Sequence, residues 1–283
     1  MNLNLGTRTR RLIEMALEED AATMDASAAA FPDDHASQAQ LVAKEPLVLA
    51  GQAVVEAVFA VVDSEIDTVF HVDDGESIRP GESLARLSGP TASLLRGERT
   101  ALNFLQRLCG IATKTHRFVE ALGDPETDIV DTRKTLPGFR ELDKYAVRCG
   151  GGKNHRFNLA GGIIVKDNHI EAAGGIAAAV ERIRDDAPHM LKIEVEVEEL
   201  AGVEAALDAG ADVIMLDNMS TAEMEAAVEH VREETGRDVL LEASGNVTLE
   251  RLPRLGGLGL DFVSSGALTH SIDAADVSML FGE

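Results

Sequence analysis

The chain has 283 residues and is strongly acidic, with 49 Asp and Glu against 26 Lys and Arg and a net charge of −23. This length allows one large domain or two modest ones, and a hydrophobic content of 45% is enough for a buried core. The charge argues against nucleic acid as a main partner, because phosphate backbones attract basic surfaces.

The acidic excess is typical of the solvated surface of a halophilic protein, which is the interpretation we favour over an ordinary acidic cytosolic protein.

No apolar run is long enough to span a membrane, and residues 1–20 have an amphipathic pattern rather than that of a signal sequence. Cys109 and Cys149 lack metal-site spacing and indicate free or buried thiols in a reducing compartment. We therefore expect a cytoplasmic protein.

The N-terminal part of the chain predicts a small sheet with a flanking helix. Residues 8–20 carry apolar side chains at the spacing of one helical face, and the Ala-, Asp- and Ser-rich residues 21–37 predict a loop. Turns with Gly and Pro separate four short strand-like runs, at residues 40–43, 54–62, 68–72 and 84–87.

A long helix is predicted next, over Thr91–Thr113, because its apolar residues recur along one helical face. Arg99, Asn103 and Gln106 share a second, polar face. This face is either solvated or a place where something docks.

From residue 128 onward, strand-like and helix-like segments alternate. The strand-like runs are 129–130, 163–165, 193–197, 213–216, 239–241 and 262–263, and the helix-like segments are 175–185, 199–209 and 221–235. Such repetition predicts parallel strands with crossover helices, and suits a TIM-like α/β barrel better than an open sheet. We predict an N-terminal domain over 1–108, a barrel over 109–269 and a tail, 270–283, that returns to the first domain.

Residues 131–166 reverse the charge of the rest of the chain, with eight Lys and Arg against three Asp and Glu. Like charges repel unless an anion lies among them. The segment therefore predicts a pocket for a small ligand with several negative charges. His155, beside Arg156 in a Gly-rich loop, is a candidate anion ligand, whereas His169 has a structural and a functional interpretation that both stay open.

The strand-like runs of the C-terminal half end in polar or Gly residues. In a β/α barrel these ends converge on one mouth, where active sites lie. Polar residues can simply mark strand ends, but a Lys directly after an apolar run favours a site, because an unpaired buried charge is costly. The charged residues at these ends are Arg133, Lys134, Lys166, Glu196 and Asp217.

Two Ser-Gly turns follow the last two strand-like runs, at Ser244-Gly245 and Ser265-Gly266. Barrels commonly bind phosphate at this position, where backbone N–H groups face the anion and Gly lets it come close. The turns are therefore candidates for phosphate binding.

Glu alternates with Val over residues 193–198. Glu196 and Asp217, one strand apart, have the oxygen ligands to hold Mg²⁺, often through water, or to bind ribose hydroxyls. For Glu194 and Glu198 we expect only pairing with nearby Lys or Arg.

Seven segments of the chain, in order, resemble one family, quinolinate phosphoribosyltransferase. They are ERTALNFLQRLCGIAT, DTRKTLPGFRELDKYAVRCGGGKNHR, IIVKDNHI, IEVEVE, VIMLDN, EASGNV and SSGALTHS. The resemblance runs from about residue 40 to the end. It implies an α/β subunit with an N-terminal α/β sandwich domain and an incomplete, TIM-like α/β barrel, paired into a homodimer whose active sites are closed by the partner's N-terminal domain.

The resemblance also implies roles for particular residues. It implies quinolinate-binding cations at Arg133, His155, Arg156 and Lys166, with Lys134 lining the pocket and Arg99 supplied by the neighbouring subunit. It implies carboxylates near the ribose and Mg²⁺ of phosphoribosyl pyrophosphate at Glu196 and Asp217, and a 5′-phosphate region at Ser244, Gly245, Ser265 and Gly266. Of these we expect Lys134, Glu196 and Asp217 to be catalytic.

The activity implied is transfer of phosphoribosyl to quinolinate with loss of CO₂, a step of de novo NAD synthesis, through an oxocarbenium-like transition state. Two features depart from the family pattern: Met24–Ser27 stands where Gly-Asp-x-Thr is frequent, and Asp143 stands where Glu is common. Two alternatives stay open: a transferase that takes nicotinate without decarboxylation, and a non-catalytic nucleotide-sensing protein. The number of cations disfavours the first, and intact Glu196 and Asp217 disfavour the second.

Overall fold

The computed structural model describes residues 3–32, 34–235 and 238–282. The chain forms two compact units, one of Met1–His116, Thr135–Gly151 and Leu268–Glu283, the other of Arg117–Lys134 and Gly152–Ala267. The predicted boundary at residue 108 lies inside helix α3 (Thr91–Leu122), which contributes residues to both units. The units also differ from the predicted domains because residues 135–151 join the first unit.

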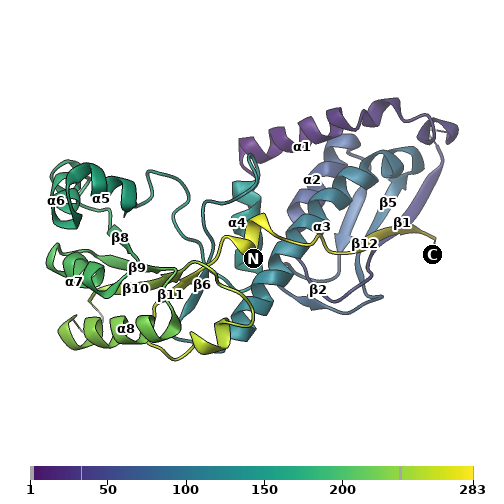
Figure 1. Ribbon diagram of the computed structural model, residues 1–283. Helices are drawn as coiled ribbons and strands as arrows, with labels where there is room; N and C mark the ends of the chain where they lie inside the picture. The colour runs from purple at the N-terminus through teal and green to yellow at the C-terminus, as the bar shows by residue number, and fades with distance from the viewer. Residues whose placement is uncertain (1–2, 33, 236–237, 283) are drawn as a thin grey trace. The chain divides into compact units, whose positions relative to one another are not determined.

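The first unit contains a small antiparallel sheet with strand order β12-β1-β5-β3. Its strands are β1 (Ala36–Ala43), β3 (Asp67–Phe70), β5 (Ser83–Pro90) and β12 (Val277–Phe281). Strand β12 pairs with β1, so the C-terminal segment lies in the same unit as the N-terminal strands (Figure 1). Two further strands, β2 (Leu47–Val48) and β4 (Ser77–Ile78), pair with each other.

Helix α1 (Thr7–Glu19) agrees with the prediction for residues 8–20. The predicted strand at residues 54–62 is wrong, because these residues form helix α2 (Gln52–Val62). Their buried side chains follow helical spacing, at Val54, Val55, Val58 and Phe59. The helix begins where the Asp74 carboxylate accepts hydrogen bonds from the N–H groups of Gly51 and Gln52, at 2.9 and 3.4 Å. A distant acid thus caps a helix whose β-branched residues favour a strand.

Helix α3 extends the predicted helix from Thr113 to Leu122, and helix α4 (Arg140–Cys149) was not predicted. Two single-turn 3₁₀ helices, Ala22–Met24 and Ala28–Ala30, interrupt the predicted loop. Asp143 is fully buried on α4, and Arg107 of α3 binds both of its carboxylate oxygens, at 3.0 and 2.8 Å. The residue that departs from the family pattern is therefore held by a bidentate ion pair.

The second unit is built on a parallel sheet of six strands with order β6-β11-β10-β9-β8-β7, which confirms the predicted alternation. Its strands are β6 (Asp128–Val130), β7 (Ile163–Val165), β8 (Ile193–Val197), β9 (Val213–Asp217), β10 (Leu240–Ser244) and β11 (Phe262–Ser264). Helices α6 (Ile176–Asp186), α7 (Leu200–Asp208) and α8 (Thr221–Thr235) lie side by side along the sheet (Figure 1).

Strands β6 and β7 form the two edges of this sheet and do not pair with each other in the described part of the chain. Beside the β6 edge, Lys153 N–H donates to the Ile129 carbonyl at 2.8 Å and Val130 bridges Lys153. The segment that carries His155 and Arg156 thus runs along an open edge of the sheet. A parallel sheet whose two edge strands, β6 and β7, do not pair with each other is an incomplete α/β barrel.

No helix within the described ranges combines the length and the apolar character that crossing a membrane requires.

Candidate active site

The C-terminal ends of the parallel strands meet at one cavity of about 460 Å³, in the second unit. Successive side chains of a strand point to opposite faces, so residues two apart share a face. The cavity is lined accordingly by Glu196 of β8, by Met215 and Asp217 of β9, by Glu242 and Ser244 of β10 and by Ser264 of β11. Ile164 and Lys166, in and after β7, line it too, together with Thr132, Arg133, Lys134, His155 and Arg156.

The cavity therefore gathers most of the residues that the sequence predicts for the site. Gly245, Ser265 and Gly266 are not among the described residues that line it. Ser265 N–H instead donates to the Val130 carbonyl at 3.0 Å, and the neighbouring Ser264 faces the cavity. Gly245 has φ +79°, and a Cβ there would lie 2.2 Å from Asn218 Oδ1, so only glycine fits this turn. Arg99 is an exposed residue of α3 in the first unit.

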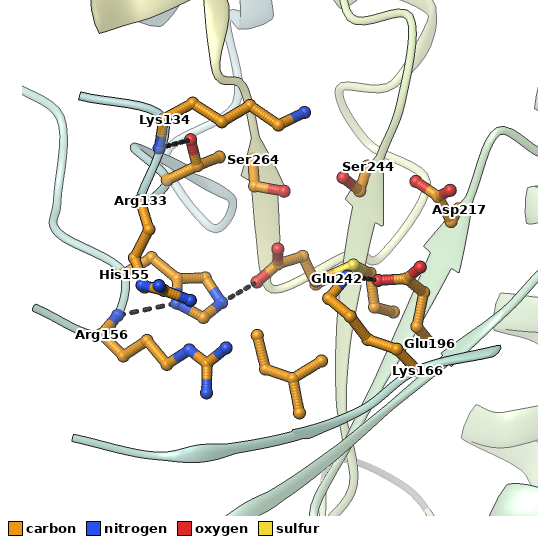
Figure 2. Close-up of a pocket in the computed structure, with 13 residues that line it drawn as sticks. Arg133, Lys134, His155, Arg156, Lys166, Glu196, Asp217, Glu242, Ser244 and Ser264 are labelled. Carbon is orange, nitrogen blue, oxygen red and sulfur yellow. Dashed lines mark hydrogen bonds and ion pairs between the residues drawn. The ribbon is translucent and has the colours of Figure 1, made fainter. Parts of the chain in front are cut away.

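One side of the cavity is cationic, with Arg133, His155 and Arg156 close together (Figure 2). Asp131, fully buried at the end of β6, fixes this side by accepting hydrogen bonds from Asn154 Nδ2 at 2.7 Å and from the His155 N–H at 2.9 Å. Burial and the nearby charge of Arg133 lower the pKa of Arg156, while Glu194 opposes this shift. The two arginines therefore repel each other until an anion lies between them.

The opposite side carries Lys166, Glu196 and Asp217 (Figure 2). Lys166 Nζ donates to Glu196 Oε2 in an ion pair between neighbouring strand ends. Asp217 accepts a hydrogen bond from Asn218 Nδ2 at 2.8 Å. His169 Nδ1 accepts one from the Lys166 N–H at 3.0 Å, a contact in which His169 supports the backbone of Lys166.

Two buried carboxylates lie beneath the cationic side. His155 Nε2 is 3.2 Å from Glu194 Oε2 and 3.5 Å from Glu242 Oε2. Their ligand atoms lie within 4.8 Å of one another, so this group is also able to hold a metal ion. Burial and the neighbouring charge of Glu194 raise the pKa of Glu242 to about 7, against the effect of His155. The expectation that Glu194 pairs with a Lys or Arg is thus corrected: its partner, at 3.2 Å, is the imidazole of His155.

Sequence reasoning missed Glu242, Asp131 and Ser264. A signal existed for Glu242, which stands inside the apolar run Leu240–Ala243 of a buried parallel strand, where an unpaired charge is costly. Ser264 could not be chosen over Ser265 without the exact end of β11, since a shift of one residue reverses the face on which a side chain lies.

The comparison with known families decides the affiliation of the chain. Family models for the C-terminal and N-terminal domains of quinolinate phosphoribosyl transferase match residues 111–280 and 21–109. The chain belongs to the quinolinate phosphoribosyl transferase family. Relatives from this family, among them proteins with solved structures, match nearly the whole chain.

A Bacillus subtilis protein named probable nicotinate-nucleotide pyrophosphorylase (carboxylating) is 44% identical to this chain, over 95% of the chain and 92% of that protein. The human nicotinate-nucleotide pyrophosphorylase (carboxylating) is 40% identical over 86% of this chain and 82% of its own length. The crystal structure of NadC from Streptococcus pyogenes is similar in fold with a TM-score of 0.93, is 42% identical and covers 100% of both chains.

Proposed function

We propose that this chain is a quinolinate phosphoribosyltransferase (decarboxylating). It transfers phosphoribosyl from phosphoribosyl pyrophosphate to quinolinate and releases nicotinate mononucleotide, pyrophosphate and CO₂ in de novo NAD biosynthesis. The relatives that bear this name support the proposal. The observation that carries it is one cavity with a cationic side facing a side that bears carboxylates.

The cationic side suits a dicarboxylate. Arg133 and Arg156 offer planar guanidinium groups that bind carboxylates through paired hydrogen bonds, and Lys166 offers a point charge from the opposite side of the cavity. Burial and repulsion from Arg133 both lower the pKa of Arg156, and a dianion between the two arginines would relieve the repulsion. We assign quinolinate binding to these three residues and to His155.

The carboxylate side suits the phosphoribosyl group. The pyridine nitrogen of quinolinate would form a bond to the anomeric carbon as the bond to pyrophosphate breaks. Glu196 and Asp217 would stabilise the positive charge that develops on the ribose, and Lys134 at the cavity would offset the charge of the leaving pyrophosphate. The bond between C2 and its carboxylate then breaks, CO₂ leaves, the electron pair stays at C2 of the positively charged ring, and this carbon takes up a proton from water. We assign the 5′-phosphate to the two turns at Ser244, Gly245, Ser265 and Gly266, of which Ser244 lines the cavity.

The donor set of the carboxylate side fits Mg²⁺, which prefers a few carboxylate oxygens and retains water. Asp217 lines the cavity and is only half-buried. Glu196 lines it as well, but its Oε2 is bound to Lys166. We therefore propose that Asp217 and Glu196 hold the ion, in part through water. Bound there, Mg²⁺ would neutralise charge on the pyrophosphate.

We propose further that the enzyme is a cytoplasmic homodimer, which can assemble into a larger oligomer, with Arg99 reaching the active site of the neighbouring subunit. Arg99 is exposed, as a residue that acts across an interface must be before the subunits meet. Two free buried cysteines, Cys109 and Cys149, support a reducing compartment.

The second candidate is a transferase that takes nicotinate. It is less favoured because a monocarboxylate needs fewer cations than the cavity gathers. Incubation with phosphoribosyl pyrophosphate, Mg²⁺ and either quinolinate or nicotinate separates the two. We expect mononucleotide from quinolinate; turnover of nicotinate alone, or of neither acid, would exclude the proposed function.

A further inference from the structure

His155 is held by protein groups through its backbone and through both ring nitrogens. Its backbone N–H donates to Asp131 at 2.9 Å. Its Nδ1 accepts a hydrogen bond from the N–H of Arg156 at 2.7 Å. Its Nε2 faces Glu194 and Glu242, at 3.2 and 3.5 Å. An acceptor at Nδ1 leaves the ring proton on Nε2, so His155 donates toward the two carboxylates.

The two carboxylates have few other partners. Glu194 is 5% exposed and Glu242 is 2% exposed. Within the described residues, the Oε1 atom of each is buried without a hydrogen-bond partner. Burying a carboxylate in this way is costly, so a specific role for both is expected. The group that their Oε2 atoms share is the imidazole of His155.

This arrangement lies between two cavities. His155, Arg156 and Glu242 line the active-site cavity, and they also line a second cavity of about 280 Å³ within the same unit. The second cavity is lined by apolar strand residues such as Val213, Leu240 and Phe262. Without the two glutamates, His155 has open space on the side away from the substrate and could turn into it.

We propose that Glu194 and Glu242 are positioning residues of the active site: together they hold the Nε2–H of His155 and thereby fix the His155–Arg156 segment against the substrate. The proposal rests on the proposed function, because it assigns to this segment the carboxylates of quinolinate. It predicts a selective effect on one substrate, since Glu196 and Asp217, the carboxylates assigned to the phosphoribosyl group, lie on the other side of the cavity (Figure 2).

The first test is steady-state kinetics of size-matched variants. Glu194→Leu and Glu242→Leu remove the acceptor and should each raise KM for quinolinate about tenfold, with KM for phosphoribosyl pyrophosphate changed less than about twofold. Glu242→Gln keeps an acceptor oxygen, so its KM for quinolinate should stay within about threefold of the value for the unaltered enzyme. Glu198→Gln, at an exposed site next to β8, is the matched control and should change neither value.

A merely structural role would raise both KM values together or lower kcat without a change in KM, and either result would overturn the proposal. A KM for quinolinate that rises as much in Glu242→Gln as in Glu242→Leu would overturn it too.

The second test needs no turnover, so it also distinguishes a failure of this proposal from a failure of the proposed function. Nitrogen NMR of the intact protein with isotope-labelled histidine, assigned with His155→Gln, should show the Nε2–H tautomer of His155. Glu242→Leu should give a mixture of tautomers. A different tautomer in the unaltered protein would contradict the proposal. So would a signal that changes when a chelator is added, because it would indicate a metal ion bound by His155, Glu194 and Glu242.

Discussion

Lys166 and Glu196 form an ion pair between the ends of neighbouring strands, with Lys166 Nζ donating to Glu196 Oε2. The lysine side chain is 45% exposed and the glutamate side chain 17%, so the pair lies at the open side of the cavity. Each residue is assigned to a different substrate, Lys166 to a carboxylate of quinolinate and Glu196 to the phosphoribosyl half. Binding of the two substrates must therefore exchange this contact for new ones.

Substitution of the two partners should consequently have different kinetic effects. Lys166→Ala removes a charged hydrogen-bond donor and should raise KM for quinolinate about ten- to hundredfold. Glu196→Gln should lower kcat about hundredfold, because it removes charge that stabilises the transition state. Steady-state kinetics with each substrate varied in turn measures both. Arg182→Ala, at an exposed site on α6, is the control for loss of a cation. Equal changes of KM for quinolinate in Lys166→Ala and Glu196→Gln would contradict the assignment.

The sequence predicted the residues whose position follows from simple periodicity. Lys166 and Asp217 were identifiable because each directly follows an apolar run, and Glu196 because Glu alternates with Val near the end of its strand; parallel strand ends converge on one edge of the sheet. Other features depend on contacts between residues distant in sequence. Helix α2 is made of residues with strand propensity and is capped by Asp74, which lies 23 residues beyond Gly51. Nothing local in sequence could indicate such a cap.

The position of Glu242 predicts a dependence of stability on pH. Burial raises its pKa from 4.5 to about 7, so the folded protein binds this proton more tightly than the unfolded chain does. Unfolding then releases a proton, and the contribution of Glu242 to stability is lost as pH rises from about 4.5 to about 7.

Glu242→Gln should remove this loss. The variant should gain stability relative to the unaltered protein as pH rises through this range, by up to a few kcal/mol at pH 7. Urea unfolding at several pH values measures the difference. A difference that stays constant from pH 4.5 to pH 7.5, or that has the opposite sign at the upper end, would show that Glu242 does not titrate in this way.

The proposed homodimer predicts complementation between inactive variants. Arg99→Ala should impair the site of the neighbouring subunit, and Lys134→Ala should impair the subunit's own site. Hybrid dimers then contain one site with both residues intact. Mixing and reassembling the two variants should restore about a quarter of the full activity, since half of the dimers are hybrids with one working site. Activity no higher than that of the separate variants would argue against a shared site.

The net charge of −23 predicts sensitivity to salt. Repulsion among acidic residues destabilises the compact chain, and salt screens it. The melting temperature should therefore fall by several degrees when KCl is lowered from about 1 M to about 0.1 M, as expected of a halophilic protein. The buffer and its pH are kept constant, so that only the KCl concentration changes. A melting temperature that is indifferent to KCl would remove the support for a halophilic source.

The most direct test of the proposed function is the ratio of CO₂ to mononucleotide. Quinolinate labelled in its 2-carboxyl group is incubated with the enzyme, Mg²⁺ and phosphoribosyl pyrophosphate, and both products are counted over time. The proposed function predicts one CO₂ for each nicotinate mononucleotide, and no release of label when phosphoribosyl pyrophosphate is omitted. Mononucleotide that retains the label, or release of label without phosphoribosyl pyrophosphate, would contradict it.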